Sequence, residues 1–146
     1  MQNTEEKRFP KIGEVYMLRF DGSGSVQTGL RPGVIFQNNI GNLRSPNTVV
    51  LPLTTSLKKL AMPTHVLLKA SDTGLARDSM VLCENPQCVP KESLGRYITT
   101  LPSHYMRQIA AASIMASGAV SFMEPGALFD VWQQAAHLNA ASEEVA

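Results

Sequence analysis

The order in which two periodicities follow one another constrains the fold of this chain most strongly. Short β-rich segments come first, at residues 14–20, 32–36, 48–53, 64–69, 79–84 and 97–101. Helical spacing appears only after residue 102. Parallel strands need a crossover, usually a helix, between them, so this order favours antiparallel pairing. We therefore expect a mainly β protein, a small and strongly bent antiparallel barrel with helices on its outside.

Two helices are predicted in the C-terminal part of the chain. The first begins after Pro102 and ends before Gly118, with one apolar stripe formed by Tyr105, Met106, Ile109, Ala112 and Ala116. The second covers residues 127–141, and its apolar face is formed by Leu128, Trp132, Ala135 and Ala136.

Residues 124–146 are expected to be a helical extension of a single domain whose main body is residues 1–123. A long apolar face is unstable in water, so the extension should pack on its own barrel or on a second copy of the chain. The alternative is that it lies in a binding groove as a built-in inhibitor, with Glu143 and Glu144 supplying negative charge.

Length and charge limit the possible functions. A chain of 146 residues forms one domain by default and can bury a core without a metal or a disulfide. Its formal net charge of +1 excludes nucleic-acid binding through bulk charge, so any such contact must come from a local patch. Residues 1–11 lack the apolar stretch of a secretory signal, and no apolar run is long enough to span a membrane, which predicts a cytoplasmic protein.

The two cysteines, Cys83 and Cys88, are expected to be free in a reducing compartment. Cys83 stands in an apolar run, which is typical of a small buried hydrophobe. The C-x4-C spacing is not a usual zinc pair, and no histidine is near it in the sequence. We predict neither a metal nor a cofactor.

A candidate phosphate site stands at the ends of two β segments. Arg31 precedes the apolar run 32–36, and the run 49–53 leads directly into Thr54, Thr55 and Ser56. If these segments pair, a guanidinium and several hydroxyls come together. A guanidinium offers a planar fork to two phosphate oxygens, and a hydroxyl can donate a further hydrogen bond.

These residues resemble the MazF/PemK-type ribonuclease toxins of toxin–antitoxin modules, whose hallmark is Gly-x-Arg-Pro followed by a strand that ends in Thr. The resemblance covers residues 11–109 and rests on the order of six segments: Gly13-Glu14-Val15-Tyr16, Gly29-Leu30-Arg31-Pro32, Asn39-Ile40-Gly41-Asn42, Pro52-Leu53-Thr54, Pro63-Thr64-His65-Val66 and Arg77-Asp78-Ser79-Met80-Val81-Leu82-Cys83-Glu84. It implies an SH3-like or CcdB-like barrel that forms a homodimer.

The resemblance implies the toxin of a type II toxin–antitoxin system, a metal-independent endoribonuclease that cuts single-stranded RNA such as mRNA at a short sequence by 2′-hydroxyl attack. Arg31, Thr54 and Glu84 would be its catalytic residues, and Glu84 would serve as the base or contact a nucleobase. The implied partners are single-stranded RNA, a MazE-like antitoxin and a second copy, and the toxin–antitoxin complex would bind DNA. The expected RNA contacts are Ser25, Gln27, Thr55, Ser56, Lys58, Asn85 and Gln87.

Among the histidines, His65 is expected to be structural, while His104 and His137 fall on predicted helices and should be surface residues. The chain departs from the family pattern at Val26, Leu82, Gln87 and Pro90, so several polar groups of the family site are missing. The alternative function is therefore a non-cleaving or degenerate barrel that binds RNA or a protein, as CcdB-like proteins do. The last residues lack the Trp-Gly-Ile of CcdB-like gyrase poisons, which argues against gyrase as the target.

Overall fold

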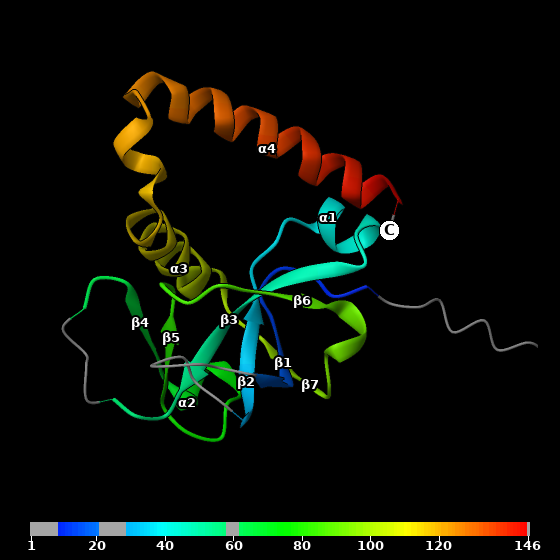
Figure 1. Cartoon of the computed structure of the whole chain (residues 1–146), viewed down its shortest axis with the longest axis vertical. Coiled ribbons are helices and arrows are strands. Elements are labelled where there is room, and N and C mark those ends of the chain that lie inside the picture. Colours follow the sequence, from blue (N-terminus) through cyan, green and yellow to red (C-terminus); the bar gives the residue numbers. More distant parts are fainter. Residues whose placement is uncertain (1–8, 21–28, 58–61, 146) are drawn as a thin grey trace, which may run out of the picture.

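The computed structural model describes residues 9–20, 29–57 and 62–145. Its elements, shown in Figure 1, follow one another as β1 (Glu14–Phe20), β2 (Gly29–Ile35), α1 (Asn39–Arg44), β3 (Asn47–Thr54), β4 (His65–Leu68), α2 (Ala70–Thr73), β5 (Ser79–Leu82), β6 (Gln87–Pro90), the 3-10 turn η1 (Lys91–Ser93), β7 (Tyr97–Thr100), α3 (Ser103–Ala116), the 3-10 turn η2 (Gly118–Phe122) and α4 (Pro125–Val145).

The seven strands form one curled, wholly antiparallel sheet in the order β4-β5-β3-β2-β1-β7, with β6 attached to β3. β3 pairs with β2 on one side, and its other side is shared between two strands. Its first residues pair with β6, and its last two, Leu53 and Thr54, pair with Val81 and Met80 of β5. A strand that changes partner along its length lets the sheet bend, so the predicted antiparallel barrel is confirmed as a curled half-barrel with α3 packed against β4 (Figure 1).

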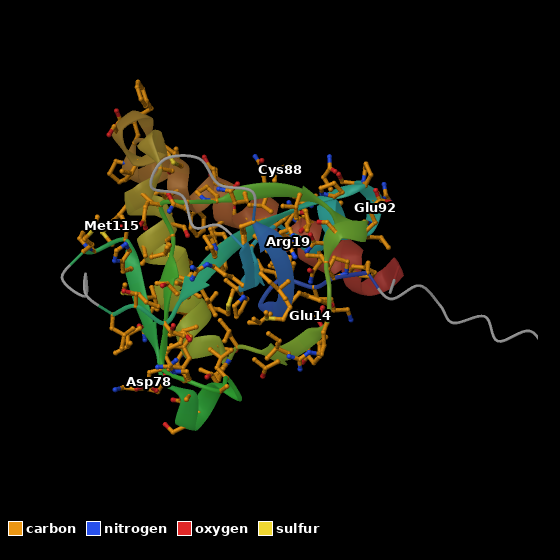
Figure 2. The ribbon with its side chains drawn as sticks, turned by 60° about the horizontal axis from the view of Figure 1, so that its bottom comes forward. Glu14, Arg19, Asp78, Cys88, Glu92 and Met115 are labelled. Carbon is orange, nitrogen blue, oxygen red and sulfur yellow. The ribbon has the colours of Figure 1, made fainter. Side chains whose placement is uncertain are left out.

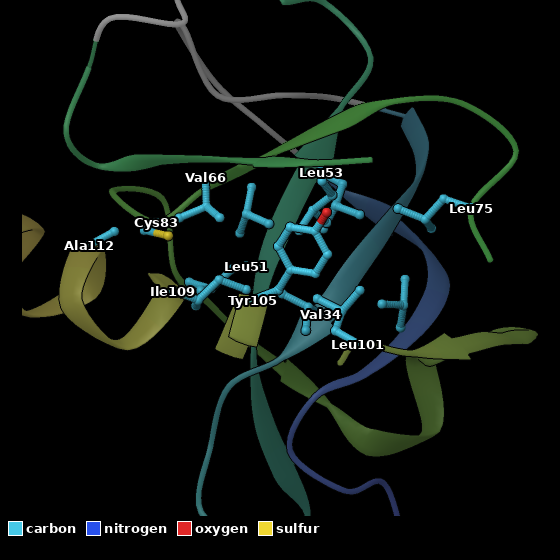
Figure 3. Packing of buried hydrophobic residues seen from close by; sticks show 13 residues of the cluster. Val34, Leu51, Leu53, Val66, Leu75, Cys83, Leu101, Tyr105, Ile109 and Ala112 are labelled. Atoms are coloured by element: carbon cyan, nitrogen blue, oxygen red, sulfur yellow. The ribbon is translucent and has the colours of Figure 1, made fainter. Parts of the chain in front are cut away.

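The core lies between the curled sheet and the first turns of α3. Figure 3 shows Tyr105 and Ile109 of α3 pointing among the strand residues of the larger apolar cluster. The Tyr105 hydroxyl donates to a carboxylate oxygen of Asp72 at 2.8 Å and accepts from the Lys69 N–H at 3.2 Å, which fixes the start of α3 against α2. The predicted stripe on this helix is therefore confirmed for Tyr105, Ile109 and Ala112, which are all buried.

Three short elements depart from the expectations. Residues 38–47, which connect two of the expected β segments, contain α1, whose start is capped by the Asn38 side chain accepting from the Gly41 N–H at 2.9 Å. α2 and β6 were not anticipated, because four residues are too few to show a period and β6 ends in a proline. Pro90 is tolerated because β6 lies off the main strand order, with β3 as its partner.

β2 also begins earlier than expected, at Gly29 rather than at Pro32. Gly29 has a φ of +91°, a conformation that costs glycine little and other residues much. The ladder between β2 and β3 starts only at Gly33, so Pro32 precedes that ladder and its missing N–H breaks none of its hydrogen bonds. The Gly-Leu-Arg-Pro sequence thus forms the part of β2 that is paired with β1 alone.

The C-terminal helix α4 is longer than predicted and packs differently. It crosses above the half-barrel and packs within its own chain chiefly against α1 (Figure 1). α1 follows the end of β2, whereas Arg31 stands near the start of that strand, so α4 and Arg31 lie toward opposite ends of β2. This position does not support the alternative that residues 124–146 form a built-in inhibitor in the groove. Among the described helices, none combines the length and apolar character needed to cross a membrane.

Candidate active site

A depression of about 340 Å³ opens beside the start of β2 and the end of β3. Its lining residues are Leu30, Arg31, Pro32, Leu53, Thr54, Thr55 and Ser79. Among these, only Arg31 is charged, and the three hydroxyl residues stand around it. We call this depression the Arg31 pocket. It has the composition expected of a site for one phosphate group.

The strand register explains why Arg31 and Thr54 meet. In the ladder between β2 and β3, Gly33 faces Pro52. Two further residues along each antiparallel strand bring Arg31 opposite Thr54, just beyond the last paired residues. The predicted pairing of the two segments is therefore confirmed, and it delivers the guanidinium and the hydroxyl to the same end of the sheet.

Thr54 is held in place by its own turn. Its side-chain oxygen accepts a hydrogen bond from the Ser56 N–H at 3.1 Å, and the residue is only 5% exposed. Accepting this bond leaves the hydroxyl proton available to donate toward the pocket. Thr55 and Ser56, the next two expected contacts, are exposed, and Thr55 also lines the pocket.

Ser79 is a lining residue that the sequence did not reveal. It stands at the start of β5, next to Met80, which pairs with Thr54. Its hydroxyl donates to the backbone oxygen of Arg77 at 3.0 Å. A serine at the start of a β segment was visible in the sequence, but only the pairing of β3 with β5 places it beside Arg31.

Glu84 lies in a different pocket. It follows the end of β5, a strand about 13 Å long, whereas Ser79 at the other end of that strand lines the Arg31 pocket. The second pocket, of about 300 Å³, is lined by Phe36, Leu51, Cys83, Glu84, Pro86, Ser113, Ala116 and Ser117. The structure therefore does not bring Glu84 together with Arg31 and Thr54.

His65 holds the Glu84 side chain. The distance between His65 Nε2 and Glu84 Oε1 is 2.7 Å, and the His65 side chain is 3% exposed while that of Glu84 is 31% exposed. A buried imidazole that fixes a carboxylate at the surface fits the structural role expected of His65. Asn85 and Gln87 are half-buried and continue the chain from Glu84 toward β6. His104, as expected, is a surface residue, and so is His137.

The remaining expected contacts, Ser25, Gln27 and Lys58, lie outside the described residues, and so does Val26. Cys83 is buried and free, and burial raises the pKa of its thiol to about 11. Cys88 is also free and is exposed on β6 (Figure 2). Within the described part of the chain, His, Cys, Asp and Glu side chains form no group of three that could hold a metal ion.

Comparison with known protein families finds one match over most of the chain. The family described as PemK-like, MazF-like toxin of type II toxin-antitoxin system matches residues 11–114. Endoribonuclease EndoA of Bacillus subtilis (strain 168) is 34% identical over 113 residues, which cover 77% of this chain and 97% of that protein. Endoribonuclease MazF of Staphylococcus saprophyticus is 36% identical over 98 residues, 66% of this chain and 82% of that protein.

Solved structures show the same fold. A mycobacterial endoribonuclease in complex with its cognate antitoxin superposes with a TM-score of 0.63 at 28% sequence identity, over 80% of this chain and 99% of that chain. The matched family ends at residue 114, near the end of α3, so η2 and α4 lie beyond it.

Proposed function

The chain belongs to the PemK-like, MazF-like toxin family of type II toxin–antitoxin systems, and from this premise we propose that its endoribonuclease reaction takes place in the Arg31 pocket. The family match and the relatives named as endoribonucleases favour a cleaving enzyme over the non-cleaving alternative. The observation that best supports this placement is the register of β2 and β3, which sets Arg31 opposite Thr54.

The proposed reaction is the attack of a ribose 2′-hydroxyl on the adjacent phosphorus of single-stranded RNA. The 2′-hydroxyl gives its proton to water and its oxygen forms a bond to phosphorus. The bond to the 5′-oxygen breaks and that oxygen takes up a proton from water, which leaves a cyclic phosphate and a 5′-hydroxyl end. Arg31 would bind two non-bridging oxygens and neutralise the charge that grows on them. Thr54 would donate a hydrogen bond to the same phosphate. Because the nucleophile belongs to the substrate, holding the phosphate in line supplies much of the catalysis.

For Glu84 the position favours a contact with RNA over the role of base at the phosphate bound by Arg31. The carboxylate is oriented by His65 and stands beyond the end of β5 from the Arg31 pocket. A carboxylate accepts hydrogen bonds from amino groups on base edges, and the amides of Asn85 and Gln87 can both donate and accept. We assign these three residues to the recognition of bases that flank the cleaved bond.

An antitoxin is the second proposed partner. The mycobacterial relative was solved in complex with its cognate antitoxin, which supports a similar complex here. We propose that a disordered, largely acidic antitoxin segment occupies the RNA-binding surface, where its carboxylates would pair with Arg31 in place of phosphate. We further propose that the toxin acts as a homodimer in the cytoplasm, where its RNA substrate is found.

The test is cleavage of a long single-stranded RNA by the purified protein in EDTA, followed by mapping of the new ends. We expect cuts at a short recurring sequence, with cyclic phosphate and 5′-hydroxyl termini. A matched oligonucleotide carrying deoxyribose at the single position 5′ to the cut should remain intact, because it lacks the nucleophile. Cleavage of that oligonucleotide would refute the internal-nucleophile mechanism, and intact RNA in every sample would favour the binding module.

A further inference from the structure

The two buried hydroxyls of the Arg31 pocket are fixed in opposite senses. Thr54 and Ser79 both line the pocket and are each 5% exposed, whereas the third hydroxyl residue of the lining is exposed. The Thr54 side-chain oxygen accepts from the Ser56 N–H at 3.1 Å. The Ser79 hydroxyl donates to the Arg77 carbonyl oxygen at 3.0 Å. Because an N–H can only donate and a carbonyl oxygen can only accept, the partners settle the direction of both hydrogen bonds.

These two directions leave different groups available to a ligand. A hydroxyl has one proton and two lone pairs. Thr54 keeps its proton, so it can donate to an atom that only accepts, such as a non-bridging phosphate oxygen. The proton of Ser79 is engaged with the backbone, so this hydroxyl offers a ligand a lone pair. The pocket therefore presents a donor from β3 and an acceptor from β5 beside the Arg31 guanidinium.

The strand register keeps this donor and this acceptor close together. Thr54 pairs with Met80, so Ser79 is the next residue along β5 and stands opposite Thr55. Neighbouring strands lie about 4.8 Å apart. In a productive complex the attacking oxygen and the phosphorus are about 3–3.5 Å apart. The two hydroxyls are therefore close enough to contact one ribose and the phosphate attached to it at the same time.

An acceptor in a phosphate pocket needs a hydrogen-bond donor on the RNA. The non-bridging and bridging oxygens of the phosphate and the ring oxygen of the ribose only accept. The 2′-hydroxyl is the one donor in the sugar–phosphate backbone, and it is the group by which a protein distinguishes RNA from DNA at a given position. It is also the nucleophile of the proposed reaction, and it belongs to the same linkage as the attacked phosphate.

Carboxylates near Ser79 are engaged elsewhere. Among the described residues that line the Arg31 pocket, none is Asp, Glu or His. Asp78 precedes Ser79 in the sequence, but its Oδ1 accepts from the Ala70 N–H at 2.8 Å and its Oδ2 lies 3.9 Å from Lys69 Nζ, which ties it to the start of α2. Glu84 follows the other end of β5 and lines its own pocket. The Ser79 oxygen is thus the described acceptor best placed for the 2′-hydroxyl.

We propose that Ser79 positions the nucleophile: its oxygen accepts a hydrogen bond from the 2′-hydroxyl of the nucleotide whose phosphate is bound by Arg31 and Thr54. This assignment rests on the proposed function of the pocket. With its proton directed at Ser79, the 2′-oxygen turns a lone pair toward phosphorus. Ser79 does not keep that proton, because its own proton stays hydrogen-bonded to the backbone and a serine hydroxyl is a very weak base. The 2′ proton passes to water as the 2′-oxygen bonds to phosphorus.

Oligonucleotides that differ at a single ribose test this contact. A 2′-amino or a 2′-fluoro group is placed at the nucleotide 5′ to the mapped cut, and neither analogue carries the 2′-oxygen nucleophile. A neutral amine donates a hydrogen bond and fluorine does not. The wild type should therefore bind the 2′-amino analogue about fivefold more tightly than the 2′-fluoro analogue, the effect of one hydrogen bond. Ser79→Ala should bind the two equally, and it should cleave the all-ribose oligonucleotide about fivefold more slowly than the wild type.

Two control variants separate this contact from general effects. Thr54→Val removes the donor to the phosphate, which both analogues share, so it should weaken the binding of both and keep the fivefold ratio. Ser93→Ala removes an exposed hydroxyl outside the pocket that also donates to a backbone oxygen, that of Pro90 at 2.6 Å. This variant should bind and cleave like the wild type. Circular dichroism checks the folding of each variant.

Failure of the pocket and failure of the Ser79 contact give different results. A wild type that leaves the all-ribose oligonucleotide intact would overturn the proposed cleavage, and the role of Ser79 with it. If the wild type cleaves but binds the two analogues equally, only the role of Ser79 is overturned, without the need for any variant. The same conclusion follows if Ser79→Ala keeps the fivefold ratio, even when it cleaves slowly, because a distorted pocket would also slow cleavage.

Discussion

α3 and α4 are both amphipathic, but the apolar face of α3 is buried and that of α4 is exposed. Tyr105, Ile109 and Ala112 of α3 are buried against the curled sheet, with Ile109 fully enclosed. On α4, Leu128, Phe129 and Trp132 are 42% to 66% exposed. Apolar residues recur at helical spacing in both helices, so this spacing alone does not predict what covers an apolar face. The sheet covers α3 because α3 starts at the end of β7, whereas η2 directs α4 away from the core.

The same contrast separates the part of the chain that holds the proposed active site from the part that follows it. The strand register of the barrel brings the lining residues of the Arg31 pocket together. The arm, from Gly118 onward, reaches α1 and leaves its apolar side chains in solvent. The proposed chemistry therefore belongs to the barrel, apart from the projecting arm. The following experiments test this division.

Replacing a buried residue of α3 should destabilise the protein far more than replacing an exposed residue of α4. Ile109→Ala leaves a cavity in the core and should lower the free energy of unfolding by about 2–5 kcal/mol. Trp132→Ala should change it by less than about 0.5 kcal/mol. Urea unfolding followed by far-UV circular dichroism measures both. A loss of similar size in the two variants would show that α4 belongs to the core.

Arg31→Ala should abolish most of the cleavage without affecting the fold. Removing one group that stabilises transition-state charge costs about 3 kcal/mol, or roughly a hundredfold or more in rate. Arg107→Ala removes the same charge from the exposed side of α3 and should cut RNA normally. Single-turnover rates on a defined oligonucleotide give the comparison, with circular dichroism as the check on folding. A wild-type rate for the Arg31 variant would remove this residue from the reaction.

Thr54→Val should slow cleavage by roughly fivefold, because valine has the shape of threonine without the hydroxyl, and one lost hydrogen bond costs ~1 kcal/mol. Thr54→Ser keeps the hydroxyl and should retain most of the activity. The valine variant also removes the acceptor for the Ser56 N–H, so its thermal midpoint should be measured beside its rate. Equal rates in the serine and valine variants would mean that the hydroxyl takes no part.

The smallest effect concerns the two cysteines. Burial raises the pKa of Cys83 to about 11 from an ordinary value of 9.0, so at pH 8 the folded protein should react with iodoacetamide at Cys88 and not at Cys83. The proton is held more tightly in the folded state than in the unfolded one. This tighter binding of the Cys83 proton stabilises the folded protein. The stabilisation is complete below about pH 9 and is lost as the pH increases toward 11. Peptide mapping by mass spectrometry shows which thiol is alkylated, and rapid labelling of Cys83 at pH 8 would contradict its burial.

Most of the strands could be predicted from local pattern, and the short elements could not. Glu14–Phe20 and the apolar runs that end near Ile35 and Thr54 were recognisable because alternation and β-branched residues persist over several positions. α2 and β6 are too short for that, and their stability comes from tertiary contacts such as the pairing of β6 with β3. Arg31 and Thr54 were predictable as a pair, because Arg31 lies near the start of one strand and Thr54 at the end of the next strand along the chain.

The separation of Glu84 from that pair could not be foreseen. In the sequence Glu84 is the last residue of a predicted β segment, and Thr54 directly follows another, so both could have belonged to one site. Antiparallel pairing of β3 with β5 reverses the direction of the second strand, so the end of β5 points away from the end of β3. Ser79, at the start of β5, takes the place beside Thr54 instead.

Residues close together in the chain were enough to predict the antiparallel class, the helical C-terminal part and the pairing of the segments that carry Arg31 and Thr54. The packing of distant segments established that His65 holds Glu84 outside the Arg31 pocket and that Trp132 stays exposed. Those outcomes depend on which distant segments come together. Local propensity and periodicity cannot predict which segments come together, because that depends on the packing of the whole sheet.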